Sequence, residues 1–417
     1  MRSTTLVRWV AITIFVFSAV LNYLDRQVLA TMAEVWTSRH EFSFTPSDYG
    51  HLVQYFSIAY AATALFVGAF IDRLGLNRGA TISVAVWGIA SLGTGMSHSM
   101  HELLLWRVLL GAAEASGVTA VGKAISLYLY PKEQAVGMAM GQLGLSLGAG
   151  LAPGFAIYFA YNHDWRWTFY AVAILSFAWI PVWLTTSRLV PPVSERVVET
   201  HKHSFGLLKD PKLWALIIGN FLAMTVYSLW TNWPPRYLVT MHHLTPAETA
   251  KYTWIVPICG YFGAMVGGTL SWRLIQRGMT PVAARKRACM LAAILLLGTM
   301  AIPFLPTPGL ATLGMSLSFF LVAFWSTNHY TLPIDVYGAS RAAFGVSGLI
   351  LAYGLMQFVI SSPVAWVAER FGFVPICFVF AFMPICSYAV VHWLIPDGAH
   401  PETVEEQPLT QKAHTTA

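Results

Sequence analysis

The sequence predicts an all-α membrane protein with twelve transmembrane helices in two pseudo-symmetric six-helix bundles. Hydrophobic residues make up 56% of the 417 residues and charged residues only 11%, which is more apolar than a water-soluble globule needs. Apolar windows of about 20 residues, long enough to cross a bilayer, recur along the whole chain. The longest internal polar stretch follows the sixth window, and six more windows come after it.

Each window is expected to be a helix, because backbone groups in lipid must be satisfied within the segment and the apolar runs are too long for barrel strands. Most loops between windows are short, so consecutive helices are expected to be antiparallel neighbours. Small residues crowd the fifth, eighth and eleventh windows, where they favour close helix packing or sliding of helices past each other. In chain order, the predicted spans are residues 9–33, 49–71, 79–97, 102–127, 134–160, 167–189, 212–239, 250–275, 287–305, 309–334, 342–368 and 373–396.

This pattern divides the chain into four segments. An N-terminal bundle covers residues 1–189, a C-terminal bundle covers residues 212–396, and a polar cytoplasmic linker over residues 190–211 joins them. Residues 397–417 are polar with scattered prolines and are expected to form a disordered cytoplasmic tail.

Basic residues predict the orientation in the membrane. Lys and Arg are concentrated in loops on the side of the N-terminus, as in the run Arg285-Lys286-Arg287. The positive-inside rule therefore predicts a multi-pass protein of the cell membrane, inner or plasma, with both termini in the cytoplasm. The net charge of +6 is explained by this asymmetry and does not predict a nucleic-acid partner. The first span carries charges and has no small-residue cleavage site, so we expect no cleavable signal peptide.

Enzyme chemistry finds no support in the sequence. The four cysteines lie in apolar windows without metal-ligand spacing, and they are expected to be core residues without a disulfide. The sequence has no nucleophile elbow, metal cluster, phosphate-binding loop or appended soluble domain. We therefore expect no enzyme activity, no metal and no cofactor. A membrane-embedded enzyme or nutrient sensor is the disfavoured alternative.

Four charged residues lie well inside the predicted spans: Asp25 and Arg26 in the first, and Arg107 and Glu114 in the fourth. A charge in a bilayer costs roughly 2.5–3.5 kcal/mol on insertion scales, so such residues persist where they pair or face a wet cavity. Arg107 and Glu114 are seven residues apart and share one helix face. If the two helices pack together, Asp25 could reach Arg107, while Arg26 points about 100° away toward a central cavity.

These residue types suggest separate roles. Arg26 is the candidate for holding a carboxylate anion, since its guanidinium is charged at any pH and its fork matches a carboxylate. Asp25 and Glu114 are the candidates for carrying protons, because a buried carboxyl group can alternate between its protonated and ionised forms. Arg107 would adjust the proton affinity of Asp25 or Glu114. The alternative is a static charge network that holds the two helices together, which an apolar interface would do at less cost.

The segment at the end of the second span has the pattern G-x-x-x-D-R-x-G-x-x-R, formed by Gly68, Asp72, Arg73, Gly75 and Arg78. At the cytoplasmic end of a helix these charges can form contacts between the two halves of the protein. Such contacts must break and re-form when the halves rock, so the segment is predicted to be a gate. It resembles the signature loop of the major facilitator superfamily.

Further motifs extend this resemblance over most of the chain. They are Asn22-Tyr23-Leu24-Asp25-Arg26-Gln27, Ser47-Asp48-Tyr49-Gly50, Arg107 with Gly111 and Glu114, Lys123, Pro131-Lys132-Glu133, Trp233-Pro234, Tyr237-Leu238 and Leu332-Pro333-Ile334-Asp335-Val336-Tyr337. Together they resemble the anion:cation symporter family of that superfamily, and within it the hexuronate and galactonate proton symporters.

The resemblance implies the major facilitator fold and proton-coupled uptake of a small organic anion. It also implies that Arg26 binds the substrate carboxylate and that Asp25 and Glu114 couple the proton. The sequence departs from the hexuronate-type pattern where hydroxyl-reading side chains are expected, at residues 116–119, Gln142, Ser146 and residues 223–227. These departures leave open whether the cargo is a sugar acid.

Four residues besides Arg26 are expected near the substrate, from their midplane depth or their position in the family: Tyr23, Tyr60, Gln142 and Asn328. For each residue alone, helix packing or the interfacial aromatic belt is the alternative role. His329 is titratable inside the tenth span, and it is either part of a proton path or a structural histidine.

The resulting hypothesis is a functional monomer in the lipid bilayer that imports a small organic carboxylate, such as a hexuronate or aldonate, together with protons by alternating access. The alternative is a proton-coupled antiporter or exporter of an amphipathic or drug-like anion, which the abundance of aromatic residues favours. The choice between proton and sodium coupling, the direction and the stoichiometry stay open at the level of sequence.

Overall fold

The structure is a computed structural model that describes residues 2–190 and 204–398. Within those residues the regular elements are all helices, which confirms the predicted all-α class. Most of the predicted linker and nearly all of the predicted tail lie outside the described residues, so both remain predictions.

The first part of the chain forms seven α-helices and one short 3₁₀ helix among the described residues. They are α1 (Arg2–Arg39), η1 (Glu41–Ser43), α2 (Pro46–Leu74), α3 (Leu76–Met96), α4 (Met100–Glu114), α5 (Ser116–Tyr128), α6 (Pro131–Asn162) and α7 (Arg166–Leu189).

The second part repeats this helical pattern. Its elements are η2 (Ser204–Lys209), α8 (Pro211–Asn232), α9 (Pro234–His242), α10 (Pro246–Thr253), α11 (Ile255–Gln276), α12 (Pro281–Leu296), η3 (Leu297–Phe304), α13 (Pro308–Tyr337), α14 (Ala339–Phe371) and α15 (Val374–Leu394).

The predicted twelve spans fall on these helices. Among the described residues, eleven helical segments are long and apolar enough to cross a membrane. The remaining predicted span, residues 49–71, lies within α2. Three of the spans consist of two consecutive helices each, namely α4 with α5, α10 with α11, and α12 with η3.

Local sequence determines where many of the helices begin and end. Proline occupies the first turn of α2, α8, α10, α12 and α13, where its missing N–H would have no helical partner. The preceding residue often caps the helix, as where Asp48 N donates to Thr45 Oγ1 at 3.3 Å and Glu248 N donates to Thr245 Oγ1 at 3.4 Å. Gly75 has a φ of 78° and makes the sharp turn between α2 and α3.

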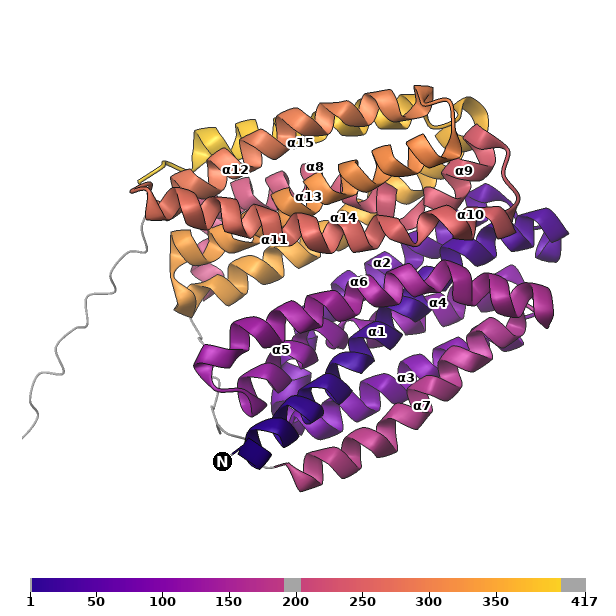
Figure 1. Ribbon diagram of the computed structural model, residues 1–417, viewed down its shortest axis with the longest axis horizontal. Coiled ribbons are helices and arrows are strands. Elements are labelled where there is room, and N and C mark those ends of the chain that lie inside the picture. Colours follow the sequence, from indigo (N-terminus) through magenta and orange to yellow (C-terminus); the bar gives the residue numbers. More distant parts are fainter. Residues whose placement is uncertain (1, 191–203, 399–417) are drawn as a thin grey trace, which may run out of the picture.

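Figure 1 shows the two bundles as two groups, with α1–α7 in indigo to magenta and α8–α15 in pink to yellow. In the first bundle α1 packs on α6 and α3 packs on α7, and in the second α11 packs on α13 and α8 packs on α15. Between the bundles, α2 packs on α14 and α6 packs on α11.

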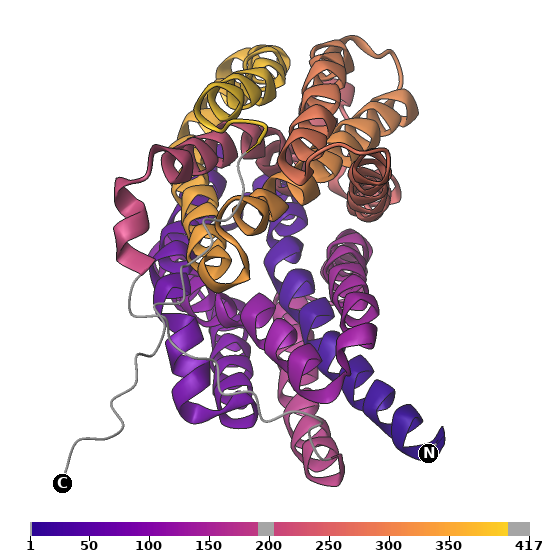
Figure 2. The same ribbon diagram turned by 90° about the vertical axis from the view of Figure 1, so that its left-hand side faces the viewer.

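The two ends of the bundles differ in what they carry. The N-terminus of α1 and the C-terminal end of α15 lie at one end, which we call the terminal face (Figures 1 and 2). The helices α9 and α10 lie at the other end, which we call the opposite face.

The bundles are joined on the half of the molecule next to the opposite face. Arg236 Nη1 donates to Glu34 Oε2 at 3.3 Å, which links α9 to α1. The Tyr49 hydroxyl on α2 donates to the Asn232 carbonyl oxygen at the end of α8 at 2.5 Å. These polar contacts close the space between the bundles toward the opposite face.

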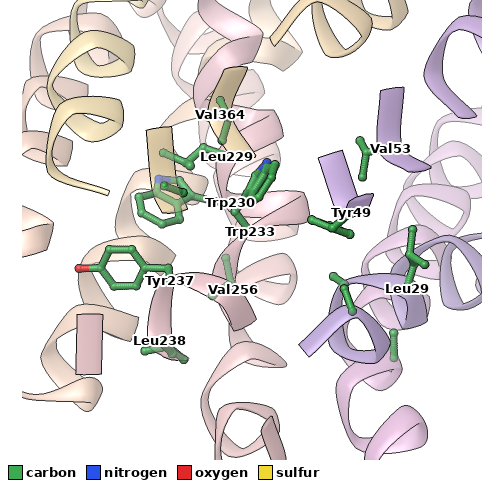
Figure 3. Packing of buried hydrophobic residues seen from close by; sticks show 14 of the residues in the cluster. Leu29, Tyr49, Val53, Leu229, Trp230, Trp233, Tyr237, Leu238, Val256 and Val364 are labelled. Carbon is green, nitrogen blue, oxygen red and sulfur yellow. The ribbon is translucent and has the colours of Figure 1, made fainter. Parts of the chain in front are cut away.

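A hydrophobic cluster covers the same joint. Figure 3 shows Leu29, Tyr49 and Val53 of the first bundle on one side and Trp230 and Trp233 of the second on the other. This cluster takes buried residues from both bundles, whereas each of the other clusters among the described residues belongs to one bundle. Removal of this apolar surface from water or lipid headgroups stabilises the closed joint.

We predict that Gly263→Ala destabilises the second bundle. An added Cβ would lie 2.1 Å from the Phe320 carbonyl oxygen, so α11 and α13 would have to move apart, and overpacking of this kind costs about 1–3 kcal/mol. Thermal unfolding of the purified protein in detergent measures the loss. Gly268→Ala on the same helix is the control, because its nearest neighbour would be 3.6 Å away. Equal melting temperatures for the two variants would contradict the prediction.

Candidate functional site

A cavity of about 470 Å³ lies between the two bundles, within the size range of small-molecule sites. Its wall is formed by α1, α2, α5 and α6 of the first bundle and by α8 to α11, α13 and α14 of the second. Of the residues predicted near the substrate, Tyr23, Arg26, Tyr60 and Gln142 line this cavity.

Arg26 is held at the cavity wall by an acid and by aromatic rings. Its Nε donates to Glu114 Oε2 at 3.0 Å, and the Arg26 side chain is 15% exposed while Glu114 is fully buried. The guanidinium carbon lies 4.8 Å from the ring centres of Tyr23 and Tyr60 and 5.0 Å from that of Phe56. Aromatic faces attract a cation, so the rings stabilise Arg26 without neutralising it.

Next to this ion pair the backbones of α4 and α2 approach each other closely. Gly111 lies one turn before Glu114 on α4, and an added Cβ there would lie 2.4 Å from the Phe56 carbonyl oxygen on α2. Glu114 is the last residue of α4, and Ala115 separates it from α5. The break and the glycine together bring the fourth span against α2 and present Glu114 toward Arg26. The sequence predicted both residues but not that they pair.

Asp25 is fully buried on the other side of α1, where it accepts a hydrogen bond from the Ser91 hydroxyl of α3. Asp25 and Arg107 interact electrostatically, as predicted, but no ion pair within 4.0 Å joins these two described residues. Ser91 occupies the hydrogen-bonding position instead, and nothing in the sequence of the third span distinguishes it from the other small residues there.

The buried acids keep unused hydrogen-bonding capacity. Asp25 Oδ1, Glu114 Oε1 and the Nε and Nη2 atoms of Arg107 have no hydrogen-bond partner among the described residues. A second cavity of about 30 Å³ is lined by both Arg26 and Arg107, and it is large enough for a water molecule. Buried polar groups of this kind are usually satisfied by an ordered water or a ligand.

Asn328 is the one predicted substrate residue that does not line the cavity. It is fully buried, and its Nδ2 donates to the Gly267 carbonyl at 3.1 Å and to the Phe324 carbonyl at 3.0 Å. The bond to Gly267 ties α13 to α11, where the glycine leaves room for the amide to reach the backbone, and the bond to Phe324 lies within α13. In this structure the contacts of Asn328 favour a role in helix packing, and its predicted role at the substrate stays a prediction.

His329 has the contacts of a structural histidine. Its ring stacks on Trp325 with centroids 4.3 Å apart, and its Nε2 lies 2.9 Å from the Leu216 carbonyl oxygen. It does not line the cavity. The geometry thus favours packing between α13 and α8 over a place in a proton path.

The predicted gate segment joins α2 to α3 at the terminal face. Arg73 and Arg78 are exposed, and Gly75 forms the turn between the helices. Gly68 and Asp72 lie in the last turns of α2, but the side chain of Asp72 lies outside the described residues. The gate role of these five residues therefore stays a prediction.

Glu34 is a functional candidate that sequence reasoning missed. The first span was expected to end at residue 33, but α1 continues to Arg39 and keeps Glu34 buried at 4% exposure. Its partner Arg236 comes from the other bundle. An acid in the sequence TMAEVW was the available signal, and only the packing of α9 against α1 identifies its partner.

Comparison of the sequence with known proteins identifies the family of this chain. A family model described as "Major Facilitator Superfamily" matches residues 15–348. The "Hexuronate transporter" of Escherichia coli (strain K12) is 26% identical over 419 residues, which is 95% of each chain. The "Galacturonate transporter" of Dickeya chrysanthemi is 24% identical over 73% of this chain and 93% of its own.

Solved structures support the fold. A bacterial homolog of the human lysosomal transporter Spinster, in an inward-facing and unoccupied conformation, matches with a TM-score of 0.70 and 19% identity over 94% of this chain and 96% of that one. A D-xylose-proton symporter matches with a TM-score of 0.74 and 14% identity over 94% of this chain and 99% of that one. At these identities the likeness concerns the fold alone.

Proposed function

Because the chain belongs to the major facilitator superfamily and is a transporter rather than an enzyme, we propose that it imports a small organic carboxylate together with protons. The relatives named as hexuronate and galacturonate transporters support an anionic cargo. The observation that carries the proposal is the Arg26–Glu114 ion pair at the wall of the central cavity.

In this proposal the substrate carboxylate and Glu114 compete for Arg26. Without substrate, Glu114 Oε2 accepts the hydrogen bond from Arg26 Nε. A substrate carboxylate that takes over the guanidinium leaves Glu114 buried without a cation, which favours its protonated form. Substrate binding and proton uptake are thereby linked, since each makes the other more favourable.

Asp25 is proposed as a second protonatable group. It lies on the same helix as Arg26 but faces α3, where Ser91 holds one of its oxygens. Arg107 is buried with unused donors and borders the small cavity next to Arg26. A water in that cavity would provide a hydrogen-bonded connection from Arg107 toward the Arg26 site.

Alternating access supplies the transport step in the proposal. The joint at the opposite face, with Glu34–Arg236 and Tyr49–Asn232, closes one exit of the cavity. Rocking of the bundles would break this joint and form contacts at the terminal face, where the gate segment lies. With the basic loops on the terminal face, the positive-inside rule makes that face cytoplasmic in a cell membrane. We further propose that the monomer is the functional unit.

Uptake by proteoliposomes with an imposed pH gradient tests this function. Labelled organic carboxylates should accumulate when the outside is more acidic, and a protonophore should abolish the accumulation. Accumulation that follows a sodium gradient instead would reject the proton as coupling ion. Accumulation driven by an acidic interior would favour the exporter or antiporter alternative.

A further inference from the structure

Two cavities meet at Arg26. Besides the central cavity, the small cavity of about 30 Å³ is lined by Arg26 and by residues of both bundles. Five described residues line both cavities and so form a partition between them: Tyr23, Arg26 and Tyr60 of the first bundle and Thr231 and Tyr353 of the second. Arg26 can therefore be approached from either side of this partition.

The small cavity lies between this partition and the joint that closes the opposite face. It is lined by Tyr49 and Asn232, whose hydrogen bond links the two bundles. It is also lined by Leu29 and Val53, which belong to the hydrophobic cluster at the joint (Figure 3). When rocking of the bundles opens this joint, the small cavity becomes an entrance from the opposite face, and the partition is the last barrier before the central cavity.

Tyr353 is the partition residue that a motion between the bundles moves most directly. Tyr23 and Tyr60 lie on the same bundle as Arg26, and each ring centre is 4.8 Å from its guanidinium carbon. Tyr353 comes from α14 of the other bundle, and among the described residues it is the only aromatic residue that this bundle contributes to the partition. A relative rotation of the bundles separates its ring from those of Tyr23 and Tyr60 and thereby opens the partition.

Gln357 holds the Tyr353 ring in place. It lies one turn after Tyr353 on α14, and its Nε2 donates to the Tyr353 hydroxyl. Its Oε1 accepts a hydrogen bond from the Ser57 hydroxyl of α2 at 3.0 Å. Gln357 and Ser57 are buried, and they line the small cavity but not the central one. One amide therefore ties the ring both to its own helix and to the first bundle.

The two helices that carry these residues are in close contact beside the partition. An added Cβ at Gly354 would lie 2.4 Å from the Ala61 Cβ, so α14 and α2 pack there without room for another side chain. Tyr353 and Tyr60 adjoin these two residues in the sequence. The close approach of the backbones therefore brings the two rings to the same depth, as a barrier made from both bundles requires.

Resting on the proposed alternating access, we infer that Tyr353 is an internal gate between the central and the small cavity, and that Gln357 is the positioning residue that keeps it shut. In this structure the gate is closed, because the Gln357 amide joins Tyr353 to Ser57. Separation of α14 from α2 breaks the bond to Ser57 and releases the ring. An anion from the opposite face then reaches Arg26 through the small cavity.

The rate at which a thiol in the small cavity is modified tests the gate without any substrate. Val53→Cys is the reporter, because Val53 lines the small cavity but not the central one. It is placed in a full-length chain whose four native cysteines are replaced by alanine, and the purified protein is treated with methyl methanethiosulfonate. The rate is then compared with and without a second substitution.

Tyr353→Ala should raise the rate of modification by about tenfold or more, since no ring then has to move before the reagent enters. Tyr330→Ala is the matched control, because Tyr330 lines the central cavity but not the small one. The control removes a side chain of the same size from the central cavity and should keep the parental rate.

Tyr353→Phe and Gln357→Leu break the bond between the two side chains with little change in side-chain size. Tyr353→Phe should raise the rate about fivefold, as expected for the loss of one neutral hydrogen bond. Gln357→Leu should raise it at least as much, since it also loses the bond to Ser57. Adding Tyr353→Phe to Gln357→Leu should give no further increase, because both substitutions act on the same bond.

Ser362→Ala is the control for a general loosening of the contact between α14 and α2. The Ser362 hydroxyl donates to Gln54 Oε1 at 2.8 Å and so also links the two helices. Ser362 lines neither cavity, so the loss of its bond leaves the ring of Tyr353 in place. This variant should be modified more slowly than Gln357→Leu.

The outcomes separate the gate from the proposed function. A rate that Tyr353→Ala raises no more than Tyr330→Ala does would reject the gate, while carboxylate import stands. A rise in Ser362→Ala as large as that in Gln357→Leu would show that the reagent enters through the joint, and would reject the role of Gln357. If no carboxylate accumulates in proteoliposomes with a pH gradient, the proposed function itself is wrong, whatever the rates of modification.

Discussion

Arg26→Ala is expected to abolish measurable binding of the carboxylate substrate. The guanidinium is the sole charge on the described cavity wall, and removing one partner of a buried ion pair costs about 3–5 kcal/mol. That free energy corresponds to a loss of about 100- to 5,000-fold in affinity. Arg26→Lys should restore binding poorly, since an ammonium lacks the planar fork that a carboxylate matches.

Binding of a labelled carboxylate to purified protein measures the Arg26 effect. Arg39→Ala is the control, because Arg39 lies at the far end of the same helix and donates to the Ala160 carbonyl at 2.8 Å rather than facing the cavity. It should bind substrate like the parent. Retained affinity in Arg26→Ala would show that the anion binds elsewhere.

Glu114→Gln should separate binding from coupling. The amide resembles the protonated acid in shape and can no longer exchange a proton, so the variant is expected to bind substrate and to exchange it across the membrane. Accumulation driven by a pH gradient should be lost. Arg26 also loses its resident carboxylate partner, so substrate should bind Glu114→Gln at least as tightly as it binds the parent.

Counterflow exchange and pH-driven uptake, measured side by side in proteoliposomes, provide the test for Glu114. Glu102→Gln at the start of α4 is the control, since Glu102 is exposed and bonds to the His98 backbone. If Glu114→Gln still concentrated substrate with the parental pH dependence, Glu114 would be a static member of a charge network. Asp25→Asn should behave like Glu114→Gln if Asp25 carries a proton, and should also lose binding if Asp25 orients Arg26.

The sequence predicted the architecture well because each span satisfies its own backbone. A helix in lipid closes its hydrogen bonds locally, so apolar length and turn residues are sufficient to predict it. The same logic identified Asp25, Arg26, Arg107 and Glu114, since an intramembrane charge stands out against its neighbours. The helical spans and these charged positions were therefore accessible without tertiary structure.

The sequence did not predict which residues those charges contact. Whether Arg26 meets Glu114, and whether Asp25 meets Ser91 or Arg107, depends on how helices rotate and cross, and several arrangements satisfy one sequence pattern. Asn328 shows the same limit, because a polar residue at midplane depth can face a cavity or a neighbouring backbone carbonyl.

What the sequence by itself determined is the set of helical spans, their division into two halves and the few charges placed among them. What only the tertiary structure decided is which of those groups face one cavity. The difference has a physical cause: helix formation in a membrane is governed by local hydrogen bonds and hydrophobic length, whereas side-chain pairing is governed by packing between segments far apart in the chain. Glu34 and Arg236, separated by 201 intervening residues of sequence, are joined by that packing alone.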